Sequence, residues 1–281
     1  KAMLKDEDYQ PKLHKSFHQD YEHAKNFLLS YRGSIDTFNS YRRDIERFLQ
    51  WCFFKANKTV KQIKRAEFEA FLSFCQKPPI SWIATTVEDR FFEKNDEKIP
   101  NTKWRPFVVK ISKTETKLGN EPNKKNYELS EKSFRALFAI IGSFYNDLIQ
   151  EEYTLINPTL LIRQKSKFYK KRKSSQPIRR LSELQWGYVI ETAEMMADEN
   201  NEQHARILFI MNALYGMYLR ISELVASDRW TPTMGDFYRD SDGLWWFLTV
   251  GKGNKERRIS VSNAMLNALK DYRKSLKLPP L

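Results

Sequence analysis

With 281 residues, 41% of them hydrophobic and 14% aromatic, the chain is long enough for two packed domains, and this composition excludes wholesale disorder. Its nine glycines are too few for a glycine-rich barrel or a nucleotide-loop enzyme. The net charge of +13 favours a polyanionic partner, most commonly nucleic acid, over a merely basic surface.

The cysteines and histidines predict neither a disulfide framework nor a metal site. Cys52 and Cys75 have no CxxC spacing, which fits a reducing cytoplasm. His14, His18 and His23 recur at helical spacing, but no cysteine or acidic cluster completes a ligand set, so we interpret them as a solvated helix face. No apolar run approaches the ~20 residues that span a bilayer.

The first half of the chain has helical periodicity in three segments, residues 34–54, 59–75 and about 130–152. Ser34 is a plausible N-cap of the first segment, and Pro78-Pro79 ends the second. Residues 80–126 lack this periodicity and hold scattered aromatic residues among charged ones. We therefore expect an inserted excursion that is partly ordered by its aromatic side chains. Asn157-Pro158 predicts a turn after the third helix.

A basic segment follows at residues 163–180, with nine Lys and Arg and no acid. Such a block repels itself and cannot be buried, so it predicts a linker. A plain flexible tether remains one interpretation. We favour a linker that tracks a phosphate backbone, because it joins two helical regions and contains Phe168 and Tyr169.

The second half combines helices with a hairpin. Ser182 is a candidate cap of one helix, and further helices are expected at about 203–214 and 263–276. Segments 243–250 and 256–262 alternate in hydrophobicity around a Gly-Asn pair, which predicts a β-hairpin. In the second strand, Ile259 and Val261 share one face.

Two cationic features need a joint explanation. Arg220 lies in the apolar stretch LYGMYLRISELV, with Glu223 three residues on. A guanidinium in an apolar setting needs an anion, which here is Glu223, another structural partner or a phosphate. The hairpin tip carries Lys252, Lys255, Arg257 and Arg258, which alone suits a merely solvated tip.

The order and spacing of these motifs, RxSEL followed about thirty residues later by GKGNKxR, resembles the tyrosine recombinase (phage integrase) family. The resemblance implies a mainly α fold with a small β-sheet: an N-terminal helical, SAM-like core-binding domain and a partial α+β catalytic domain. We assign residues 1–162 to the first, with an excursion at about 77–126, residues 163–180 to the basic linker, and residues 181–281 to the second.

The family's motif implies roles for matching residues. Arg220 would bind the scissile phosphate, Glu223 would orient the site, and Lys252 would act as general acid toward the leaving 5′ hydroxyl. No metal or cofactor is expected, because cationic donors around the phosphate do most of the work in phosphoryl transfer. The residues expected to bind DNA are Arg42, Arg43, Lys165, Lys167, Lys170, Lys171, Arg172, Lys173, Arg179, Arg180, Lys255 and Arg257.

The chain also departs from the family pattern. Many members have Gly-Leu-Arg at the turn, whereas Tyr218 stands here before Leu219-Arg220. Nothing after the hairpin matches the family's His-x-x-Arg segment or its nucleophilic tyrosine, and we interpret Tyr272 as helix packing. We therefore expect a fragment that binds DNA but is itself inactive.

The resulting hypothesis is a cytoplasmic site-specific recombinase or integrase of a mobile element. It would cut and rejoin double-stranded DNA through a 3′-phosphotyrosyl intermediate and assemble as a tetramer on DNA, with no membrane and no small-molecule substrate. The alternatives are a non-catalytic DNA-binding regulator on the same scaffold and an RNA-binding helical protein.

Overall fold

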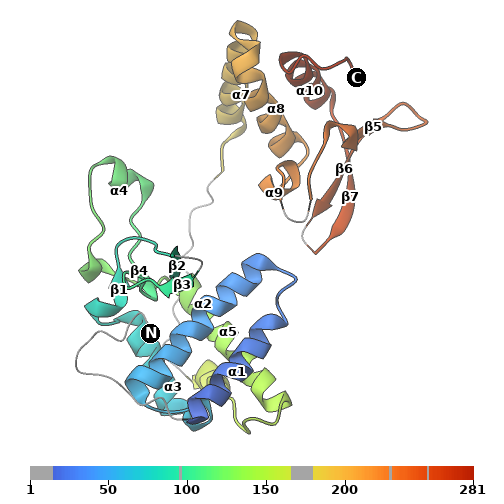
Figure 1. Cartoon of the computed structure of the whole chain (residues 1–281). Coiled ribbons are helices and arrows are strands. Elements are labelled where there is room, and N and C mark those ends of the chain that lie inside the picture. The colour runs from blue at the N-terminus through green and yellow to red at the C-terminus, as the bar shows by residue number, and fades with distance from the viewer. Residues whose placement is uncertain (1–14, 95–96, 166–179, 228–229, 252) are drawn as a thin grey trace. The chain divides into compact units, whose positions relative to one another are not determined.

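The computed structural model describes residues 15–94, 97–165, 180–227, 230–251 and 253–281 (Figure 1). The chain divides into two compact units, residues 1–173 and 174–281, and the division falls inside the basic segment. Helices dominate the described residues, and the strands form small sheets of two or three. The prediction of a mainly α fold with a small β-sheet is therefore confirmed.

Unit 1 is built on long helices that enclose an aromatic core. The helices are α1 (Lys15–Leu29), α2 (Ile35–Trp51), α3 (Arg65–Gln76), α4 (Lys113–Lys117), α5 (Glu131–Gln150) and α6 (Pro158–Lys165). The strands are β1 (Ile83–Ala84), β2 (Phe91–Lys94), β3 (Glu97–Pro100) and β4 (Phe107–Val108). β1 pairs with β4 in parallel, and β2 forms an antiparallel hairpin with β3.

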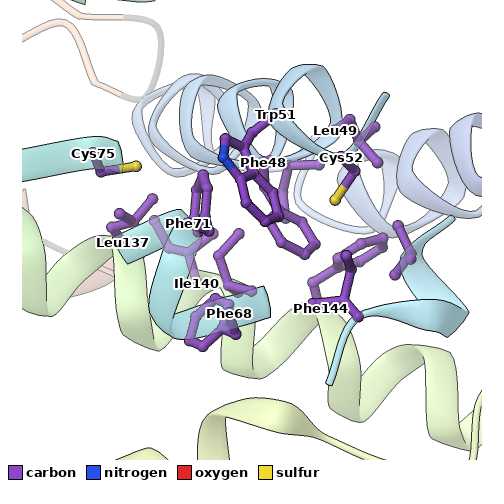
Figure 2. Close-up of a cluster of buried hydrophobic side chains, with 14 of the residues drawn as sticks. Phe48, Leu49, Trp51, Cys52, Phe68, Phe71, Cys75, Leu137, Ile140 and Phe144 are labelled. Atoms are coloured by element: carbon purple, nitrogen blue, oxygen red, sulfur yellow. The ribbon is translucent and has the colours of Figure 1, made fainter. Parts of the chain in front are cut away.

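The apolar stripes of α2, α3 and α5 meet in the centre of unit 1 (Figure 2). Phe48 of α2 contacts Phe68 and Phe71 of α3 edge-on, with ring centroids 6.2 and 5.0 Å apart. Such edge-to-face pairs add to the stabilisation that burial of the rings provides. The cysteines Cys52 and Cys75 are free and fully buried in the same core, and burial raises the pKa of both thiols. Neither is therefore poised to react.

The excursion between α3 and α5 is anchored by its aromatics, as expected. Trp82, Trp104 and Phe107 are all buried. Arg47 of α2 lies over the Phe107 ring, 4.8 Å from its centroid, and donates from Nε to the carbonyl oxygen of Pro106 at 2.7 Å. These contacts attach the excursion to α2.

Two boundaries differ from the sequence expectation. The second helix begins at Arg65, not at residue 59, because Glu67 accepts a hydrogen bond from the backbone N–H of Lys64 and so caps the helix there. Asn157-Pro158 starts a helix instead of forming a turn. Asn157 accepts from the backbone N–H of Thr159 at 3.0 Å, and proline suits the first helical position. Residues 163–165 of the predicted linker are therefore helical.

The N-terminal histidines do not form the fully solvated face that was expected. On α1, His18 is exposed, but His23 packs against Tyr153, with ring centroids 4.0 Å apart. Tyr153 donates in turn to the buried carboxylate of Asp20 at 2.7 Å. His14 lies outside the described residues. Within the described ranges, no group of three or more His, Cys, Asp and Glu side chains is placed to hold a metal ion.

Unit 2 consists of helices and one three-stranded sheet (Figure 1). The helices are α7 (Glu183–Glu199), α8 (Asn201–Gly216), α9 (Ile221–Leu224) and α10 (Asn263–Ser275). The strands β5 (Phe237–Arg239), β6 (Trp245–Gly251) and β7 (Lys255–Ser260) follow one another antiparallel in that order. Ser182 caps α7 through its hydroxyl, as predicted, and Tyr272 packs on Phe209 with ring centroids 5.0 Å apart.

The predicted hairpin is present. Gly253 and Asn254 have φ of +78° and +58° at its tip, the left-handed conformation that a Gly-Asn pair favours. In β6, every second residue from Phe247 to Gly251 is buried, and this face packs toward α9 and the core of unit 2. None of the helices in the described part of the chain has the length and apolarity to cross a bilayer.

Candidate functional site

The site begins at the N-terminus of α9, where Arg220 and Glu223 interact twice. Arg220 has an extended backbone just before the helix. Its backbone N–H donates to Glu223 Oε2 at 2.8 Å, and its Nη1 donates to Glu223 Oε1 at 2.9 Å. Glu223 therefore caps the short helix and holds the guanidinium with the same carboxylate.

A second arginine reaches the same carboxylate from the hairpin. Arg257 of β7 donates from Nη2 to Glu223 Oε2 at 2.6 Å. Thr249, which faces Arg257 across the strand pair, donates from its hydroxyl to the backbone carbonyl of Glu223 at 3.3 Å. The hairpin thus contacts both the side chain and the backbone of Glu223.

The carboxylate of Glu223 is buried, with 1% of its side chain exposed. Burial alone raises its pKa. The hydrogen bonds from the Arg220 backbone and side chain, with the charge of Arg257, outweigh burial and hold the pKa of Glu223 below its ordinary value of 4.5. Glu223 is therefore ionised at neutral pH and faces two guanidinium groups, which leaves the site with an excess positive charge.

Arg220 itself remains open to solvent, with 61% of its side chain exposed. Of the two terminal guanidinium nitrogens of Arg220, only Nη1 donates a hydrogen bond to Glu223. A planar guanidinium offers five N–H donors, so Arg220 can bind a phosphate while Glu223 fixes its orientation. The anion that meets Arg220 inside the fold is thus Glu223, and the exposed part of the fork is available for a second one.

Tyr218 explains how the turn before Arg220 is made without glycine. Its φ is +50°, a left-handed conformation that glycine adopts easily and that strains other residues. Tyr218 is 82% exposed, so its side chain can adopt this backbone conformation without displacing packed neighbours. The turn therefore has the conformation that a glycine at this position would favour, although the residue differs.

Gly251 is a second requirement of the site, because of the space that it leaves free and not because of its backbone conformation. A Cβ at this position would lie 2.8 Å from Glu223 Oε1 and 3.7 Å from Arg257 Nε. The first distance is shorter than real Cβ contacts allow, so glycine lets the hairpin approach the buried carboxylate. In the sequence, Gly251 is marked only as part of the GKGNKxR motif, and no local pattern marks Thr249.

The remaining predicted residues fall into separate places. Lys255 is exposed at the start of β7, and Arg180 is exposed ahead of α7. Lys165 lies in α6. The predicted general acid and most of the predicted linker contacts lie outside the described residues: Lys252, Lys167, Lys170, Lys171, Arg172, Lys173 and Arg179.

Arg42 and Arg43 lie on α2 of unit 1. Arg43 is exposed and donates to Asp44 at 3.2 Å. Arg42 lies over the ring of Phe38, and its pKa is lowered by burial and by the nearby charge of Arg90. The DNA contacts of both arginines stay a prediction.

The chain resembles curated tyrosine recombinases in sequence. It is 28% identical over 144 residues to tyrosine recombinase XerD of Rickettsia bellii (strain RML369-C), and 26% identical over 145 residues to tyrosine recombinase XerD of Rickettsia conorii (strain ATCC VR-613 / Malish 7). These alignments cover 51% and 52% of this chain, and each covers 44% of the relative. The chain thus spans less than half the length of the curated relatives it matches. No protein-family model matches it.

The fold of the chain also aligns with two crystal structures of XerH site-specific recombinase. The pre-cleavage complex bound to difH substrate aligns over 94% of this chain and 58% of that chain, with 15% identity and a TM-score of 0.44. The post-cleavage complex bound to palindromic difH substrate aligns over 100% of this chain and 68% of that chain, with 15% identity and a TM-score of 0.45.

Proposed function

We propose that this chain is part of a tyrosine recombinase, a DNA-breaking and rejoining enzyme that acts on double-stranded DNA. The observation that carries the proposal is the joint site of Arg220, Glu223 and Arg257. The two motifs that suggested the family from sequence alone meet at one buried carboxylate. The sequence relationship to the Rickettsia recombinases supports the same assignment.

In the proposed reaction, a tyrosine hydroxyl attacks the scissile phosphorus, and the bond from phosphorus to the 5′ oxygen breaks. The tyrosine loses its proton to solvent, and Lys252 gives a proton to the leaving 5′ oxygen, so the products are a 3′-phosphotyrosyl bond and a free 5′ hydroxyl. Arg220 stabilises the charge that develops on the phosphate, because its fork is held in place before DNA arrives. No step calls for a metal or a nucleotide.

Unit 1, the basic segment and unit 2 are proposed to bind the duplex together. The positive charge of the chain and the arginines of α2 support contacts to phosphates, which supply much of the affinity of proteins for DNA. Assembly as a tetramer on DNA is part of the proposal. Action in the cytoplasm, which the buried, unpaired cysteines fit, is also part of the proposal, as is action on behalf of a mobile element.

The test uses the intact natural protein that contains these residues and a duplex with its own target site, nicked so that cleavage releases a short end. Arg220→Ala should abolish cleavage while DNA affinity falls only slightly. Because Arg220 is mostly exposed, its removal should cost at most about 1 kcal/mol of stability. DNA binding with no cleavage by the wild-type protein would instead favour the non-catalytic regulator. Cleavage retained in Arg220→Ala would refute the role of this residue.

A further inference from the structure

Arg257 was expected to touch DNA, yet its position in the sheet points elsewhere. Residues alternate between the two faces of a strand, and Arg257 pairs with Thr249, whose side chain is fully buried. Its neighbour Arg258 pairs with Leu248 and lies on the opposite face, exposed. Arg257 therefore extends over the inner face of the hairpin, toward α9.

The partner that Arg257 finds there is Glu223. The 2.6 Å bond from its Nη2 to Oε2 is a charge-assisted hydrogen bond to a carboxylate that water barely reaches. The Arg257 side chain is 39% exposed, and its buried Nε has no hydrogen-bond partner among the described residues. This orientation places the guanidinium against protein over much of its surface.

The contact fixes more than an ion pair. Oε2 of Glu223 accepts from Arg257 and from the backbone N–H of Arg220, while Oε1 accepts from the Arg220 guanidinium. When Arg257 holds Oε2, the carboxylate of Glu223 is fixed in one orientation. The position of Oε1 then determines where the guanidinium of Arg220 lies. The sequence separates the two arginines by 37 positions, and the carboxylate joins them.

We propose that Arg257 is a positioning residue, which acts through Glu223 to hold the guanidinium of Arg220 in place for the scissile phosphate. This inference rests on the proposed function. It assigns Arg257 to the alignment of the site, where the sequence had assigned it to DNA binding. It also links the tip region of the hairpin to the arginine that is proposed to bind the phosphate.

The first experiment measures cleavage and DNA affinity of the intact protein for Arg257→Ala, Arg257→Lys and the matched control Arg258→Ala. A misplaced Arg220 should lower the rate of cleavage by bound protein about 10²-fold in Arg257→Ala. The DNA dissociation constant and its salt dependence should stay near those of wild type. Arg257→Lys should restore part of the rate, because an ammonium group also donates to the carboxylate. Arg258→Ala should cleave at the wild-type rate once bound.

A second experiment needs no DNA and uses the 281-residue chain. Without Arg257, the pKa of Glu223 should rise toward its ordinary value, so the stability that the lowered pKa contributes is missing. In a series of unfolding measurements toward acid pH, Arg257→Ala should be less stable than wild type or Arg258→Ala at neutral pH, and this difference should shrink as pH falls. If Arg257→Ala instead reduces the slope of log affinity against log salt by about one and leaves both cleavage of bound DNA and acid unfolding unchanged, Arg257 is a phosphate ligand and the inference fails. Failure of wild-type cleavage would count against the proposed function, and acid unfolding would then still show whether Arg257 holds the Glu223 carboxylate.

Discussion

Replacing Gly251 by alanine tests whether the hairpin and the buried carboxylate fit as closely as the structure indicates. The added Cβ would lie 2.8 Å from Glu223 Oε1, and ordinary contacts of this kind begin at 3.4 Å. Oε1 must therefore move by roughly 0.6 Å, which strains or breaks its 2.9 Å bond to Arg220. The backbone at Gly251 does not require glycine, since its φ is not positive.

The expected cost has two parts. Inserting a methyl group into a packed site costs about 1–3 kcal/mol. Weakening the bond to a mostly exposed arginine adds about 0.5–1 kcal/mol, because solvent screens that pair. Gly251→Ala should therefore lower the free energy of unfolding by roughly 1.5–4 kcal/mol.

The matched control is Gly187→Ala in α7 of the same unit, where an added Cβ meets none of the described residues within 4 Å outside its own stretch of helix. Alanine inside a helix is favoured over glycine by about 0.5–1 kcal/mol, so this variant should be more stable than wild type. Urea unfolding followed by circular dichroism compares the two. Equal effects of the two substitutions, or a neutral Gly251→Ala, would show that the close approach to Glu223 is not real.

Other consequences concern the same site and the linker. Because the pKa of Glu223 is lowered on folding, the stability that its charge contributes is present above pH 4.5 and lost as pH falls through the lowered value. The difference in stability between wild type and Glu223→Gln, measured by urea unfolding, should therefore vanish in acid. Tyr218→Gly should unfold with nearly wild-type free energy, whereas Tyr218→Val should lose about 1–2 kcal/mol at the left-handed turn. A 5′-bridging phosphorothiolate substrate, whose sulfur leaves without a proton, should rescue cleavage by Lys252→Ala in the intact protein. If the substrate rescues Lys255→Ala and not Lys252→Ala, then Lys255 is the general acid. Neutralising residues 170–173 with glutamine should weaken binding to all DNA sequences and reduce the log–log salt slope by up to about one per lost phosphate contact, and an unchanged slope would mean a simple tether.

Local signals in the sequence predicted much of the fold. The helices with strong apolar stripes, the Ser182 cap and the Gly-Asn hairpin are all present. The two-residue strands of the excursion and the three-residue strand β5 were missed, because such short strands are set by the contacts around them. Asn157-Pro158 was interpreted as a turn although the same pair suits a helix start, so only the hydrogen bond to Thr159 decides between them.

The site was predicted in part for a similar reason. The spacing of Arg220 and Glu223 indicated their pairing, because it is a local, i to i+3 relation. Arg257 was assigned to DNA because it lies in a cationic segment. The alternation that placed Ile259 on one face of the strand also places Arg257 there, which was the available signal. What that face meets depends on how α9 packs on the sheet, and this cannot be read from neighbouring residues.

The most direct test of the account is the chemical identity of the bond between the intact protein and its DNA. A nicked duplex with the target site is incubated with the protein, and the attached peptide is then mapped after digestion. The account predicts protein joined to the 3′ end of the DNA through a tyrosine, and no such product with Arg220→Ala. Attachment to a 5′ end, attachment through serine, or tight binding without any covalent product would contradict it.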